Sequence, residues 1–188
     1  LLRAGSNLKL LAENSLRVRD SVENPFIAAA GGQLLLEGKG GVDLAALNHP
    51  DSGLFSGRNM VLRSSKTIGG DAHYTSLGNF RIEKLDGSLG NLASPRDPII
   101  RASGDVRFDT YEGASLHILA GGEVEVGTVT ITGTEAVDFL AEEITLSDGQ
   151  TRVEIDGSRQ PTLDVRGGMN PAAISPLGLS GVLGILQP

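Results

Sequence analysis

Apolar residues recur along the chain in short triplets, in which two apolar residues flank one residue of any kind. Each triplet follows a small residue, a glycine and a polar residue, as in Ala4–Leu10, Ala30–Leu36 and Ser56–Leu62. Alternation with a period of two predicts a strand with one buried side, whose first and third residues face a core. The eight triplets that fit best are Leu8/Leu10, Leu34/Leu36, Met60/Leu62, Phe80/Ile82, Val106/Phe108, Val124/Val126, Ile144/Leu146 and Leu163/Val165.

Successive triplets begin 18 to 26 residues apart, which is too short for a strand–helix–strand crossover with its loops. Many repeats also hold a second triplet, such as Leu16/Val18 or Val42/Leu44, with Gly, Asn, Asp or Ser between the two. Several short strands per repeat predict one turn of a solenoid whose neighbours cover its core from above and below. The expected fold is therefore all-β, a parallel β-helix of about eight coils, with glycines at corners that need positive φ or close approach.

The middle residue of each triplet should point outward. Most of these positions are charged, and Arg107 is expected to lie next to Glu125 as an opposite-charge pair. Leu35 and Val61 are apolar at this position, so we expect a loop or a neighbouring molecule to cover them. The full column is Lys9, Leu35, Val61, Arg81, Arg107, Glu125, Thr145 and Asp164.

Three stretches lack the triplet pattern and predict irregular inserts, near residues 47–57, 69–76 and 92–98. Residues 1–170 would form the shaft, and the Gly-, Pro- and Leu-rich residues 171–188 would cap it or continue it. Inserts on solenoids often supply the binding surface. The predicted partner contacts are His49, Phe55, His73 and Tyr74 in the inserts, together with Leu35 and Val61.

Composition narrows the possible partners. Aromatic residues make up only 4% of the chain, whereas glycine occurs 26 times, which suits a narrow, layered interior. The net charge of −7 argues against a nucleic-acid partner, because such a partner selects for Lys and Arg. The absence of cysteine excludes thiol catalysis and disulfides. The chain does not begin with Met, and we expect it to be an excerpt from a longer polypeptide.

Few residues suggest chemistry. The three histidines, His49, His73 and His117, have no metal-ligand spacing, and we expect them at the surface. No calcium-binding repeat is present, and Gly38–Gly41 lacks the spacing of a phosphate loop, so no cofactor or metal is predicted.

One pair of carboxylates has two interpretations. Asp105 and Glu123 would lie in adjacent coils, at a separation at which two acids could hydrolyse a glycoside. Both also occupy the polar position before a triplet, where Asn7 and Asn59 stand in other coils. A position that accepts any polar residue favours a structural role.

Several longer phrases carry a family resemblance. AGSNLKLLAEN, ASGDVRFDTYEGASLHILAGGEVEVGTVTITG, ITLSDGQ, SRQPTLDVRGG and MNPAAI resemble the large filamentous-haemagglutinin-type exoproteins of cyanobacteria, over roughly residues 4 to 175. The resemblance implies a right-handed β-helix, two-partner secretion through an outer-membrane partner, and a role as a surface fibre or adhesin.

The expected function is therefore structural and non-enzymatic. The chain would be a shaft segment of a secreted or cell-surface protein that binds a glycan or a neighbouring fibre protein and can associate end to end. The alternative is a carbohydrate-active β-helix, either a polysaccharide lyase or a tailspike-like depolymerase.

Overall fold

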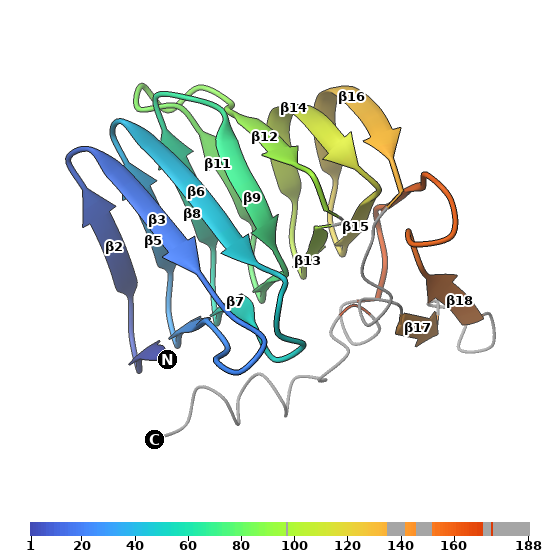
Figure 1. Ribbon diagram of the computed structural model, residues 1–188, viewed down its shortest axis with the longest axis horizontal. Coiled ribbons are helices and arrows are strands. Elements are labelled where there is room, and N and C mark those ends of the chain that lie inside the picture. The colour runs from blue at the N-terminus through green and yellow to red at the C-terminus, as the bar shows by residue number, and fades with distance from the viewer. Residues whose placement is uncertain (97, 135–141, 146–151, 171–173, 175–188) are drawn as a thin grey trace.

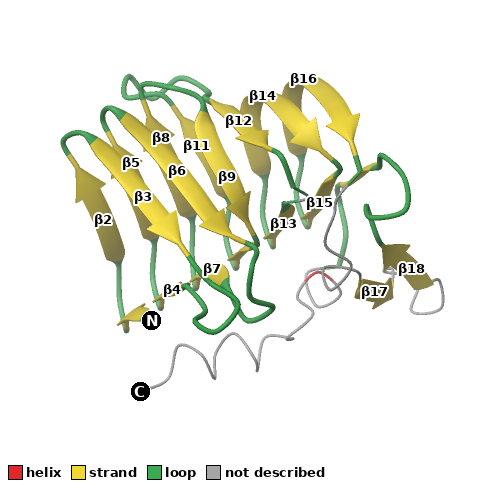
Figure 2. Ribbon diagram, viewed as in Figure 1, coloured by secondary structure: helices red, strands yellow, loops and turns green. Residues whose placement is uncertain are grey.

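The computed structural model describes residues 1–96, 98–134, 142–145, 152–170 and 174. The elements assigned along these residues are all β-strands. Figures 1 and 2 show strands in consecutive layers, with the chain advancing one layer at a time from β2 towards β16. Most strands belong to two parallel sheets, which we name sheet A and sheet B.

Sheet A has seven strands, each paired in parallel with the next. Because each third strand returns to this sheet in the first four layers, the chain winds instead of folding back on itself. In spatial order the strands are β1 (Leu2–Ala4), β4 (Ile27–Ala30), β7 (Gly53–Ser56), β10 (Tyr74–Ser76), β13 (Ile99–Ala102), β15 (Leu116–Ala120) and β19 (Leu163–Arg166).

Sheet B consists of two series of parallel strands that meet at one long strand, β14 (Val106–Ala114). The second long strand, β16 (Val124–Gly133), pairs with β14 along its length, with one register shift near Ala114. One series contains β2 (Leu8–Ala12), β5 (Leu34–Gly38), β8 (Met60–Ser64) and β11 (Phe80–Glu83), and the other contains β3 (Ser15–Arg19), β6 (Gly41–Ala46), β9 (Ile68–Ala72) and β12 (Asn91–Ser94).

The predicted register is confirmed through six layers. Backbone pairing aligns the outward column Lys9, Leu35, Val61, Arg81, Arg107 and Glu125 residue by residue. The residues on either side of each outward position face the core, and Leu34, Leu36, Met60 and Leu62 are fully buried. The protein is therefore all-β, with parallel strands stacked around one apolar interior.

The corners between sheets A and B explain the glycine before each triplet. A Cβ atom on Gly57 would lie 2.3 Å from the carbonyl oxygen of Gly31 in the layer below, closer than any real contact. Close approach is thus confirmed as the reason for glycine here, whereas the expected positive φ is wrong at Gly57 and Gly31. The only positive-φ residues of the described chain are Gly41, Gly87 and Gly168.

The three predicted inserts are wrong, because strands of the regular stack lie in each of them. Residues 47–57 contain β7, residues 69–76 contain β10, and residues 92–98 contain most of β12. The strands of sheet A escaped detection because both of their sides are buried, which removes the polar alternation. In β7, for example, Leu54 faces the core while Phe55, on the opposite side, is only 9% exposed.

A different departure follows β16. Ile144, expected to stack as a parallel triplet, lies in β17 (Glu142–Thr145), which pairs antiparallel with β18 (Arg152–Ile155) outside both large sheets. Leu163 and Val165 do stack, but in sheet A and not in the column of Leu8 and Leu10. The triplet pattern is wrong at these places because alternation marks a half-buried strand without specifying its partner. Leu146 and residues 171–173 and 175–188 lie outside the described residues.

Candidate functional site

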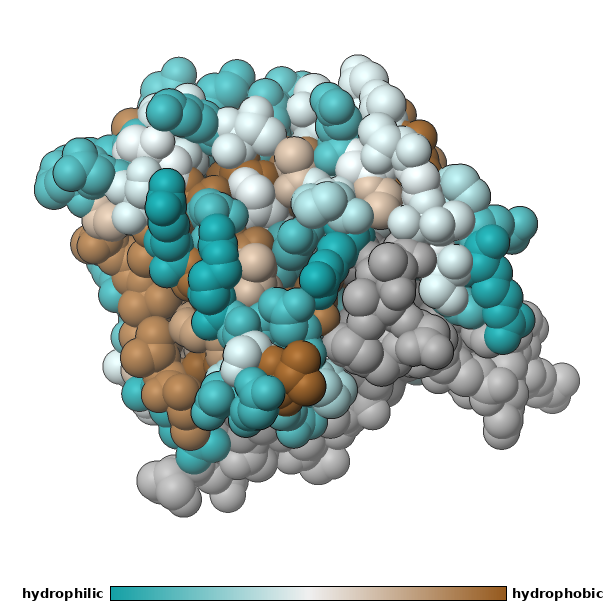
Figure 3. Space-filling view, viewed as in Figure 1, coloured by the Kyte–Doolittle hydropathy of each residue, from teal (hydrophilic) through white to brown (hydrophobic). Residues whose placement is uncertain are grey.

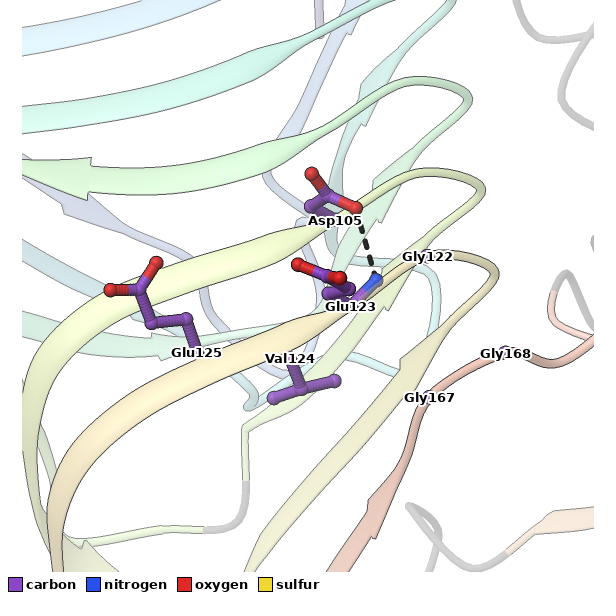
Figure 4. A pocket seen from close by; sticks show the side chains of 7 residues that line it. All are labelled: Asp105, Gly122, Glu123, Val124, Glu125, Gly167 and Gly168. Atoms are coloured by element: carbon purple, nitrogen blue, oxygen red, sulfur yellow. Dashed lines mark hydrogen bonds between the residues drawn. The ribbon is translucent and has the colours of Figure 1, made fainter.

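The candidate site is a cleft where the two sheets end at different layers. Sheet A continues beyond β15 with β19, whereas in the described chain sheet B ends at β16. One strand position, next to β16 and in the layer of β19, is therefore unfilled by the residues that the structure describes. The cleft has a volume of about 900 Å³ and is lined by Asp105, Gly122, Glu123, Val124, Glu125, Gly167 and Gly168 (Figure 4).

A glycine turn opens this position. The backbone N–H of Gly168 donates to the carbonyl oxygen of Gly122 at 2.9 Å, and Met169 donates to Ala120 at 3.0 Å. At Gly168 φ is +69°, a conformation that L side chains rarely adopt. The chain therefore turns away after β19 and does not continue into sheet B as in the lower layers.

The floor of the open layer is apolar. Leu163 and Val165 pair with Leu116 and Ile118, which are fully buried core residues, so all four stand in the same inward columns. Leu163 is nevertheless 51% exposed and Val165 is 43% exposed. On the facing side, Val124, Val126, Val129 and Ile131 of β16 pack against the core and remain half-buried.

The backbone of β16 presents an open edge. In the lower layers, the first residue of each triplet donates its N–H to the carbonyl oxygen of the polar residue in the next layer. This bond recurs five times, at 2.8–3.0 Å, from Leu8, Leu34, Met60, Phe80 and Val106 to Gln33, Asn59, Asn79, Asp105 and Glu123. Val124 is the next residue of the series, so its N–H points into the cleft.

The rim of the cleft is acidic. Asp105, Glu123 and Glu125 lie around one guanidinium, that of Arg107, at N···O distances of 3.2, 3.6 and 3.6 Å. The predicted Arg107–Glu125 pair is thereby confirmed. Figure 4 shows Glu123 and Glu125 projecting from the same strand, with Asp105 on the layer below.

The geometry gives Asp105 a structural role. Its Oδ1 accepts the backbone N–H of Glu123 at 3.0 Å, and Asn7, Asn59 and Asn79 make the same bond to the next layer at 2.8–3.0 Å. A carboxylate in this position therefore does what an amide does elsewhere, which supports the structural interpretation of the Asp105–Glu123 pair. In the described part of the chain no group of three or more His, Asp or Glu side chains could hold a metal ion.

The six predicted contact residues do not form one site. Tyr74 is fully buried, donates its hydroxyl to Gly70 and packs against Phe80, so it has no surface to offer a partner. His49 is half-buried in a loop, where its Nδ1 accepts the N–H of Asp51. Phe55 lies on the outer side of sheet A, which is largely covered.

Leu35 and Val61 are adjacent, as predicted, and both are half-buried. They line a shallow groove of about 260 Å³ together with Lys9 and Arg63. Whether a neighbouring molecule covers them stays a prediction.

Two histidines lie deeper than expected. The outward side of sheet A carries His117, which is 1% exposed, and Arg101, which is 3% exposed, so the surface position predicted for His117 is wrong. Part of this side is covered by Met169 and Ile174, which pack on Ile99 and Leu119.

His73 lies in the same region and is half-buried, with its Nε2 atom enclosed and lacking a hydrogen-bond partner. Desolvation lowers the pKa of His73 to about 3, and the positive charge of Arg101 adds to the effect.

Sequence reasoning did not find the cleft. Its residues belong to ordinary triplets, and only the order of strands in the two sheets leaves the position beside β16 open. The single local signal is the pair Gly167–Gly168 after the last triplet, where earlier layers continue with a polar residue and a new triplet.

Comparison with known proteins adds no relative to these observations. No family model, curated protein or solved structure matches the chain. The described residues include no helix with the length and hydrophobicity needed to cross a membrane.

Proposed function

We propose that the chain is a right-handed parallel β-helix of about eight coils that serves as a structural shaft segment of a secreted surface adhesin or extracellular fibre. The unbroken parallel register of the outward column from Lys9 to Glu125 is the observation that carries the proposal. A stack in which each layer pairs only with its neighbours transmits load along one axis and can be extended without changing its design.

Side-chain bonds between layers support a load-bearing role. Arg63 bridges Glu37 of the layer below and Glu83 of the layer above, at 3.1 and 2.8 Å. The corner amides add one side-chain-to-backbone bond between several pairs of layers. These contacts reinforce the backbone pairing at the surface, where water would otherwise compete for it.

The proposed partners are a glycan or a neighbouring fibre protein, and a second copy that associates end to end. Hydrophobic side chains gather on the flank of the molecule where β2 and β3 lie, as Figure 3 shows. Leu8, Leu10 and Leu16 of these strands are only half-buried, which supports association at this end. Two-partner secretion, with an outer-membrane partner, completes the proposal.

Antibodies raised against the chain test its location and role together. Immunogold labelling of intact source cells is expected to decorate the outer surface or extracellular fibres. Labelling confined to the interior of sectioned cells would contradict the proposal.

The carbohydrate-active alternative is tested separately. Incubation of the chain with acidic and neutral polysaccharides is expected to release no reducing ends and no unsaturated products. Release that Glu123→Gln abolishes would favour the alternative and make the rim of the cleft an active site.

A further inference from the structure

We propose that the cleft is a strand-acceptor site: an extended segment of a partner polypeptide adds to β16 as a parallel strand and fills the open position beside β19. Its apolar residues would alternate with polar ones, and an arginine or lysine would lie opposite Glu125. The acceptor edge would bind this segment whatever the role of the whole protein.

The backbone of β16 supplies the first part of the argument. Glu123 already accepts the N–H of Val106 at 2.9 Å, so the carbonyl of Glu123 is directed towards β14. In a parallel ladder the neighbouring residue uses its N–H and C=O on the opposite edge. Val124 therefore offers an N–H donor to the cleft, in the position that five lower layers have filled with a carbonyl oxygen.

The apolar floor supplies the second part. An added strand would place every second side chain above Val124 and Val126, and those side chains would also face Leu163 and Val165. Leu163 and Val165 are 51% and 43% exposed although they stand in columns whose lower members are fully buried. Burying this area on an apolar side chain is favourable by about 25 cal/mol per Å².

Charge complementarity supplies the third part and selects the occupant. Glu123 and Glu125 project from the acceptor strand and share the single cation Arg107 with Asp105. Their exposed fractions, 85% and 60%, leave both carboxylates accessible to a cation from the open side. Directly opposed pairs of opposite charge stabilise a strand pair, whereas like charges destabilise it.

The chain itself provides a template for the partner strand. β14 lies in parallel register on the other edge of β16, with Arg107 opposite Glu125 and Val106 opposite Val124. On its own other edge, the carbonyl of Asp105 accepts the N–H of Phe80 at 2.8 Å, the same bond that Val124 would make. A peptide with the sequence of residues 105–114 thus has the required alternation, register and basic residue.

The probe is a fluorescent synthetic peptide of residues 105–114 carrying Asp105→Asn, because Asn stands in that position at Asn59 and Asn79. Anisotropy titration with the full chain is expected to show saturable one-to-one binding. The same peptide with Arg107→Glu is expected to bind about fivefold more weakly or less, because like charges would then lie opposite one another.

Two variants of the chain locate the binding. Val124→Pro removes the outward N–H and is expected to weaken binding about tenfold or more, whereas Val124→Thr keeps this N–H and should bind within about threefold of the unmodified chain. Should Val124→Pro fail to fold, the charge exchange decides: Glu125→Lys is expected to reverse the preference, so that the Arg107→Glu peptide binds more tightly than the probe.

Absence of saturable binding, or binding that neither Val124→Pro nor Glu125→Lys changes, would overturn the proposal. A concentration-dependent dimer that Val124→Pro abolishes, without peptide binding, would assign the edge to a second copy and would also overturn it. Surface labelling of cells does not depend on these results, so failure of the acceptor site and failure of the fibre role can be distinguished.

Discussion

Asp105 and Glu123 are joined by a hydrogen bond between adjacent layers, in which the carboxylate of Asp105 accepts the backbone N–H of Glu123 at 3.0 Å. The same position binds the next layer through Asn7, Asn59 and Asn79. An acidic pair that suggests glycoside chemistry in the sequence is therefore, in the structure, one step of a corner ladder.

Removal of this ladder step should cost stability according to the acceptor that remains. Asp105→Ala deletes the acceptor and is expected to lower the free energy of unfolding by about 1 kcal/mol. Asp105→Asn keeps an oxygen at the position and should cost clearly less. Urea unfolding followed by circular dichroism measures both, and equal losses for the two variants would contradict the ladder.

Corner glycines should be sensitive to a methyl group only where a layer lies beneath them. Gly57→Ala would place Cβ 2.3 Å from the carbonyl of Gly31 and is expected to cost about 1–3 kcal/mol. Gly5→Ala, at the same repeat position, meets no atom within 4 Å and is the matched control. Thermal unfolding of both variants is the measurement, and a similar loss at the two positions would show that stacking is not the cause.

Acid should destabilise the protein through His73. Its pKa is about 3 in the folded chain and about 6.5 when unfolded, so between these values the unfolded state binds more protons. Stability is therefore lost as the pH falls from about 6.5 towards 3. Compared with His73→Asn, the unmodified chain should lose up to about 1.4 kcal/mol more per pH unit in this window. Parallel stability curves for the two proteins would refute the assignment to His73.

The Arg63 bridge should contribute in a salt-dependent way. Hydrogen bonds to Glu83 and Glu37 raise the pKa of Arg63, and the three side chains are partly buried. Arg63→Met keeps the aliphatic stem and is expected to cost about 1 kcal/mol at low ionic strength. The difference from the unmodified chain should shrink in 1 M NaCl, where screening acts within about 3 Å. A cost that is unchanged in salt would point to packing as the cause.

Local chemistry determined much of the fold. The triplets predicted the strands of sheet B, their inward residues and the outward column from Lys9 to Glu125, because half-buried strands must alternate. Sheet A was missed because its strands are buried on both sides. Ala29 and Leu119, for instance, face away from the main core yet are fully buried. A strand without a polar side carries no alternation for a sequence pattern to detect.

What the sequence by itself determined was which residues turn inward and that layers repeat, since both follow from spacing within one strand and its neighbour. Only the tertiary structure decided where the stack changes partners. Ile144 and Leu163 carry the same kind of triplet, yet one lies in an antiparallel pair and the other in sheet A. The open edge at Val124 arises from that choice, because strand pairing is a relation between distant segments and alternation within one segment is compatible with many partners.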